Sequence, residues 1–245
     1  MYISRPDPIR FLTGQLSSTP FPQAISSVDG GGKFTHQGEV LTFPGNTFIC
    51  HIDKQSRAFS ALVQMQREIM ESPHGRFFTF LPPQSFHMTI FQGVTSVCSS
   101  HEKGWPKDIP FGEMRDDVTA RFVEKLADQS FPSRVAVSAH DLFTCHSLTM
   151  TGASEADEKA LRAVRDQLSE VTSIRFKDHD RYIFHVTLAY LLQWVDPQAA
   201  EEIVSFGDGL FARYSEDLQS IPIGPIEFCN FETMHHFEPV SYLKD

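Results

Sequence analysis

The chain has 245 residues, a formal net charge of −10 and 41% hydrophobic residues, an apolar content that is ordinary for a soluble globular protein. The acidic balance argues against a protein that grips long nucleic acid through its phosphates, whereas a small nucleotide or an RNA end needs only a local group of donors. No apolar stretch approaches the roughly 20 residues of a membrane span, and the first residues lack the apolar core of a signal peptide. We therefore expect a cytoplasmic protein with no membrane partner; the sequence does not indicate the oligomeric state.

Residues 1–32 are predicted to form an irregular N-terminal extension, because they hold four prolines, several serines and a run of three glycines. Residues 33–245 show no low-complexity linker and are expected to fold as one unit. The four cysteines are scattered rather than paired as in zinc or redox motifs, so buried thiols are expected.

Periodicity and turn signals predict alternating strands and helices along this unit. Apolar residues at three-and-four spacing indicate helices, and Ser154 and the Asp196-Pro197 pair are good helix starts. The predicted elements are a short strand or hairpin at 33–41, strands at 47–52, 77–81 and 86–90, helices at 56–70 and 113–128, strands at 135–137 and 148–151, a helix after residue 154, a hairpin from 174 into a strand at 184–188, a helix at 197–214, and a last strand at 221–231.

Two of these strands carry nearly the same sequence: Phe-His-Met-Thr-Ile at 86–90 and Phe-His-Val-Thr-Leu at 184–188. Successive side chains of a strand point to opposite faces, so in each segment the histidine and the threonine share one face while the apolar residues take the other. The shared-face residues are His87, Thr89, His185 and Thr187. A single copy of this segment is more often a core strand whose histidine is hydrogen-bonded to the backbone. Two copies in matching sequence context favour a common functional role for the two histidines.

Two imidazoles brought to one substrate suggest paired acid and base chemistry. An ordinary histidine pKa of about 6.5 lets one ring act as base and the other as acid near neutral pH, which predicts a bell-shaped pH profile. The threonine hydroxyls are placed to donate hydrogen bonds to charged oxygens of a substrate.

Other side chains are weaker candidates. Tyr182 faces away from His185 on a continuous strand, and it lines the cleft only if the strand bends. His51 alternates with Ile49 and is a candidate groove residue. We retain Tyr182 and His51 as candidate substrate contacts. Packing, turn or surface roles are favoured for Asn46, Thr47, Trp105, His179, Arg181, Tyr190, His235 and His236.

The two His-x-Thr strands, with Leu-Pro-Pro-Gln-Ser before the first and His-Asp-Arg-Tyr-Ile before the second, resemble the two-histidine (2H) phosphoesterase superfamily of cyclic phosphodiesterases and RNA ligase-like proteins, in a branch of uncharacterised function. The resemblance covers roughly residues 33–230. It implies a bilobal α+β fold in which two antiparallel β-sheets face a central groove, with helices packed outside. It also implies chemistry without metal or cofactor, with His87 and His185 as general base and general acid in an undetermined order, and Thr89 and Thr187 on the phosphoryl oxygens.

The leading hypothesis is therefore a phosphodiesterase that hydrolyses a 2′,3′-cyclic nucleotide or a related RNA-end phosphate. One alternative is a 2′–5′ RNA ligase or RNA-end processing enzyme, which the acidic charge disfavours because an extended RNA track should be basic. Another is a non-catalytic nucleotide-binding module. A metal hydrolase is weaker still. The extra N-terminal segment and a long loop at 96–112 are both able to cap the groove and change the size of the substrate.

Overall fold

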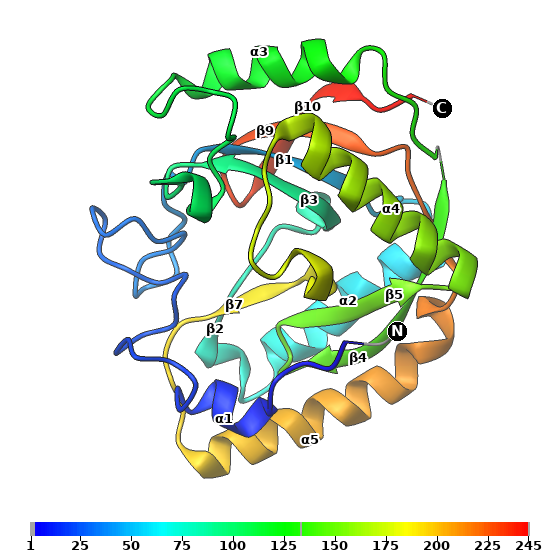
Figure 1. Cartoon of the computed structure of the whole chain (residues 1–245). Helices are drawn as coiled ribbons and strands as arrows, with labels where there is room; N and C mark the ends of the chain where they lie inside the picture. The colour runs from blue at the N-terminus through cyan, green and yellow to red at the C-terminus, as the bar shows by residue number, and fades with distance from the viewer. Residues whose placement is uncertain (1–2, 133, 245) are drawn as a thin grey trace.

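A single curved, eight-stranded antiparallel sheet forms the centre of the molecule in the computed structural model, which describes residues 3–132 and 134–244 (Figure 1). Its strand order is β10-β9-β1-β3-β6-β5-β4-β8, and β2 and β7 form a separate two-stranded sheet. The strands are β1 (Gly45–His51), β2 (Phe78–Phe80), β3 (His87–Thr95), β4 (Val135–Phe143), β5 (Ser147–Gly152), β6 (Phe184–Thr187), β7 (Ala189–Leu191), β8 (Ile221–Ile223), β9 (Glu227–Thr233) and β10 (His236–Tyr242).

The large sheet consists of two halves that meet at one residue pair. β10, β9, β1 and β3 form one half, and β6, β5, β4 and β8 form the other. Among the described residues, β3 and β6 are joined by the antiparallel pair Met88–Val186 alone. The expected bilobal α+β fold with antiparallel sheets is confirmed, and the two expected sheets are continuous through this pair.

Helices cover the outside of both halves (Figure 1). They are α1 (Pro8–Leu12), α2 (Arg57–Glu71), α3 (Arg115–Leu126), α4 (Glu155–Thr172) and α5 (Pro197–Tyr214), with short 3-10 helices at Gly75–Phe77, Pro83–Ser85, His101–Lys103, His179–Arg181 and Ser215–Leu218. α4 packs on β3, β4 and β5, and α5 packs on β4. None of the helices in the described part of the chain combines the length and apolar content that crossing a bilayer requires.

The four longer helices lie where periodicity and capping predict them. Ser56, Ser154 and Asp196 each accept a hydrogen bond from a main-chain N–H in the first turn of α2, α4 and α5, which satisfies a donor that has no partner within the helix. Pro197 occupies the first position of α5, where its missing N–H costs nothing. Local chemistry therefore decides where these helices begin.

Two predicted strands differ in the structure. Residues 174–183 form a loop and a 3-10 helix instead of a hairpin. The predicted last strand at 221–231 is interrupted after Ile223, so that β8 pairs with β4 while β9 pairs with β1 in the other half of the sheet. Pro222 and Pro225 have no N–H to donate, which prevents one regular strand from continuing through this stretch. β10 follows β9 and was not predicted.

The N-terminal segment packs onto the body of the protein. α1 contacts α5 and buries Leu12 completely, and Ile25 is buried further along. Figure 1 shows the segment running from α1 past β2 and β7 before it enters β1. The boundary expected at residue 32 stays a prediction. All four cysteines are free thiols, and three of them, Cys50, Cys145 and Cys229, are buried.

Candidate active site

The two motif histidines are held in the same way. His87 Nδ1 lies 2.7 Å from the main-chain oxygen of Ser85, and His185 Nδ1 lies 2.9 Å from that of Ile183. A carbonyl oxygen only accepts hydrogen bonds, so Nδ1 carries the hydrogen in both rings. In the neutral imidazole this leaves Nε2 of each ring with a free lone pair for proton transfer.

The pairing of β3 with β6 brings the two motifs together. Because Met88 opposes Val186 in an antiparallel pair, continuing the register places His87 beside Thr187 and Thr89 beside His185. Side-chain alternation puts all four on one face of the sheet. They line a common cavity of about 140 Å³.

Burial lowers the pKa of both histidines to about 4. Desolvation is the largest cause for each ring, because it penalises the charged form. The nearby charges of His51 and Lys33 act in the same direction on His87, and those of Arg5 and Lys33 on His185, while the carbonyl hydrogen bonds oppose the shift. The ordinary pKa expected from the sequence is therefore wrong for the free protein, in which both rings are neutral at pH 7.

Tyr182 lines the same cavity. It directly follows the 3-10 helix His179–Arg181 and precedes β6, so the strand alternation that would turn it away from His185 does not apply. Its hydroxyl interacts with the Thr89 side chain, and the Arg165 guanidinium carbon lies 3.9 Å from its ring centroid. Burial raises the pKa of Tyr182, so the phenol is neutral at pH 7.

His51 is not among the residues that line this cavity. It opposes His87 in the β1–β3 pair, and the two ring centroids lie 6.1 Å apart in an edge-on arrangement. Its Nδ1 lies 2.9 Å from Glu227 Oε2, and its main-chain N–H donates to Glu227 Oε1. The structure thus places His51 beside a motif histidine, and a direct substrate contact by His51 stays a prediction.

The cavity is also lined by residues that the sequence did not place there, among them Asn46, Thr47, Lys33 and Tyr190. Tyr190 was assigned to the core by alternation from His185, but the strand is interrupted at Leu188 between β6 and β7, and the alternation restarts there. Tyr190 therefore lines the cavity with Lys33, a residue of the loop before β1. No local pattern marks either residue.

A third histidine, His146, lies close to the second motif. His146 and His185 both line a larger adjoining cavity of about 830 Å³, one wall of which is the N-terminal segment. The His146 ring stacks on Phe11 at 5.4 Å, and its Nδ1 lies 2.6 Å from Thr144 Oγ1. Thr144 and Cys145 have φ angles of 47° and 60°, a left-handed turn that is unusual for a β-branched residue. Burial lowers the pKa of His146 to about 3, so this ring is neutral.

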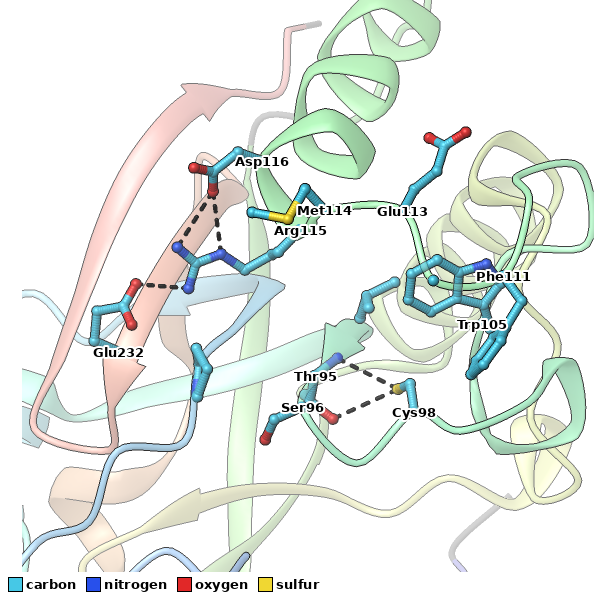
Figure 2. A pocket seen from close by; sticks show the side chains of 13 residues that line it. Thr95, Ser96, Cys98, Trp105, Phe111, Glu113, Met114, Arg115, Asp116 and Glu232 are labelled. Carbon is cyan, nitrogen blue, oxygen red and sulfur yellow. Dashed lines mark hydrogen bonds and ion pairs between the residues drawn. The ribbon is translucent and has the colours of Figure 1, made fainter.

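A separate cavity of about 480 Å³ lies at the start of α3 (Figure 2). It shares Thr95 with the motif cavity, and its lining contains no histidine. Figure 2 shows its cation, Arg115, between Asp116 and Glu232, which both pair with it. Trp105 and Phe111 meet edge-on at 5.2 Å on the other side. This cavity offers apolar contacts beside the groove but no acid–base pair.

The structure also shows what three weaker candidates from the sequence, Asn46, Trp105 and His179, contact. Asn46 is fully buried and joins Val94 N–H to the Thr119 hydroxyl. The Trp105 indole N–H donates to the Ile109 oxygen, which anchors the 96–112 loop. His179, Asp166 and Asp180 offer ligand atoms within 4.8 Å of one another. Arg175 pairs with both carboxylates, so this cluster is an ion-pair network.

Comparisons with known proteins agree with this geometry. Residues 33–144 match the family described as 2H-phosphodiest, a domain of unknown function (DUF1868). The chain is similar to the crystal structure of a conserved protein of unknown function from Agrobacterium tumefaciens str. C58, with 27% sequence identity and a TM-score of 0.88 over 96% of this chain and 98% of that one. No curated protein matches the chain.

Proposed function

The chain belongs to the 2H phosphoesterase family, and from this premise we propose that it is a metal-independent phosphodiesterase of a cyclic phosphodiester, either a 2′,3′-cyclic nucleotide or a related RNA-end phosphate. One observation carries the proposal. His87 and His185 line one cavity with the same ring nitrogen of each tied to the backbone.

The reaction needs two proton transfers. Nε2 of one neutral histidine takes a proton from a water molecule while the oxygen of that water bonds to phosphorus. The bond from phosphorus to one ribose oxygen breaks, and the other histidine, as imidazolium, donates a proton to that oxygen. The product is a phosphomonoester, and the two rings have exchanged protonation states. The Thr89 and Thr187 hydroxyls donate to the oxygens of phosphorus that do not react.

The lowered pKa of both rings sets how the acid acquires its proton. At pH 7 the free protein holds both imidazoles neutral. A phosphodiester brings one negative charge into the cavity, and an opposite charge within a few ångströms favours the protonated ring. Substrate binding therefore favours protonation of one histidine. That imidazolium is the general acid, and the other, neutral histidine is the general base.

The proposal is tested with a panel of 2′,3′-cyclic mononucleotides and 2′–5′ dinucleotides incubated with the protein in EDTA, with products identified by chromatography. Hydrolysis of the cyclic substrates to monophosphates is the expected result. Joining of a cyclic phosphate end to a 5′-hydroxyl end would favour the RNA ligase alternative. Binding without turnover would favour the nucleotide-binding module, and loss of activity in EDTA would favour a metal hydrolase. A folded protein that neither binds nor converts any member contradicts the proposal.

A further inference from the structure

Lys33 reaches the groove from a well-anchored loop. Its main-chain N–H donates to the Ala24 oxygen at 2.7 Å, and its own oxygen accepts from Leu41 N–H at 2.8 Å. The next residue, Phe34, is completely buried and forms β-bridges with Ile25 and Val40. These contacts determine where the lysine side chain emerges from the loop.

The Lys33 ammonium lies between two aromatic rings. Its Nζ is 5.3 Å from the ring centroids of both Phe43 and Tyr190, and 3.4 Å from the Tyr190 hydroxyl oxygen. Aromatic faces attract a cation without neutralising it. Within residues 3–132 and 134–244, no ion pair joins Lys33 to a carboxylate. Its charge therefore remains available to an anion.

The Lys33 side chain lies close to both motifs. It lines the small cavity that holds His87 and His185 and also the larger cavity that holds His185 and His146. Burial is the main cause of the lowered pKa of His87 and of His185, and the Lys33 charge lowers both further. A single ammonium that acts on both rings lies near the place where a phosphoryl group would bridge them.

We propose that Lys33 is a catalytic residue that binds an oxygen of the phosphoryl group held between His87 and His185. The inference rests on the proposed function and extends it. Attack on a singly charged phosphodiester adds negative charge to the phosphoryl oxygens, and Thr89 and Thr187 offer only neutral donors. A fixed cation at those oxygens stabilises the transition state more than the ground state. The Lys33 side chain is then part of the active site.

Three variants separate this role from a structural one. Lys33→Met removes the charge and keeps an unbranched chain, and Lys33→Arg keeps the charge. Lys54→Met removes the charge of an exposed lysine outside the cavity lining. The first readout is the Kd of inorganic phosphate at pH 7, followed by NMR titration, because it does not depend on turnover. The second is kcat on any phosphodiester that the wild type hydrolyses, and the third is the thermal unfolding midpoint.

Lys33→Met is expected to weaken phosphate binding by about tenfold or more, the scale of a hydrogen bond to a charged group, and to lower kcat by about 10²-fold. Lys33→Arg should recover part of both, and Lys54→Met should match the wild type. If Lys33→Met does not fold, Lys33→Gln takes its place: weaker phosphate binding by a folded Lys33→Gln than by the wild type supports the assignment, and unchanged phosphate binding contradicts it.

The inference and the proposed function fail in different ways. Hydrolysis that is equal in the wild type and Lys33→Met leaves the function standing and overturns the role of Lys33. Phosphate binding that depends on Lys33 in a protein that hydrolyses no phosphodiester keeps the anion site and overturns the function. A wild type that does not bind phosphate overturns the assignment of Lys33.

Discussion

Met88 and Val186, the residues directly after the two motif histidines, oppose each other in the antiparallel pair that joins the halves of the sheet. In the register that this pair defines, the histidine of each motif lies beside the threonine of the other. Neither motif alone builds the site, because each histidine has the hydroxyl of the other strand as its neighbour. The two histidines and two threonines of the motifs are therefore arranged with approximate twofold symmetry, which suits a reaction that removes one proton and delivers another.

The pH dependence of activity should be displaced toward acid. The pKa of both His87 and His185 is about 4, so the singly protonated free enzyme is most abundant near pH 4 and falls about tenfold per pH unit above pH 5. We expect kcat/KM, which reports the free enzyme, to decrease from pH 5 to pH 8. The kcat profile should lie at higher pH, because the bound phosphodiester raises the pKa of one ring. A kcat/KM profile centred near pH 6.5 would contradict this electrostatic description.

The protonated nitrogen of each histidine can be observed directly. Hydrogen bonds to the oxygens of Ser85 and Ile183 require a hydrogen on Nδ1. In ¹⁵N NMR at pH 7, both rings should show Nδ1 as protonated and Nε2 as unprotonated, and they should keep this pattern down to about pH 5. Exposed His36 serves as the internal control, and its signal should be averaged between the two tautomers. The opposite tautomer in either ring would remove the proposed proton-transfer atom.

The leaving group of the substrate distinguishes the acid from the base. A 4-nitrophenyl phosphodiester expels a stable phenolate and needs little help from a general acid. The variant that lacks the acid, either His87→Ala or His185→Ala, should lose about 10²-fold or more on a cyclic nucleotide but only a few-fold on the nitrophenyl ester. The variant that lacks the base should lose activity on both. Equal losses by both variants on both substrates would count against separate acid and base roles.

Gly93 has room for no side chain. A Cβ atom there would lie 2.0 Å from Asn46 Oδ1 and 2.6 Å from the Asn46 main-chain oxygen, and Asn46 is itself fully buried and hydrogen-bonded. Gly93→Ala should lower the free energy of unfolding by about 1–3 kcal/mol, as overpacking does. The matched control is Gly209→Ala, in helix α5 with no atom within 4 Å of the added Cβ, which should raise it by up to about 1 kcal/mol. Urea denaturation measures both, and equal stability of Gly93→Ala and the wild type would contradict the packing argument.

Features encoded by neighbouring residues could be predicted from the sequence, and features that depend on distant contacts could not. The helices follow from periodicity and caps such as Ser154, and the shared face of His87 and Thr89 follows from strand alternation. Tyr190 was misplaced because the alternation restarts after a break that no turn residue marks. Lys33 and His146 reach the groove through a loop anchored by buried Phe34 and through a left-handed turn, and neither arrangement has a local signature.

The most direct test of two-histidine catalysis is kcat on a 2′,3′-cyclic mononucleotide, in EDTA, for the wild type, His87→Ala, His185→Ala and the exposed control His36→Ala. We expect a loss of about 10²-fold or more in each motif variant, with a wild-type unfolding midpoint and retained phosphate binding, and no loss in His36→Ala. A folded His87→Ala or His185→Ala that turns over within a few-fold of the wild type would contradict it.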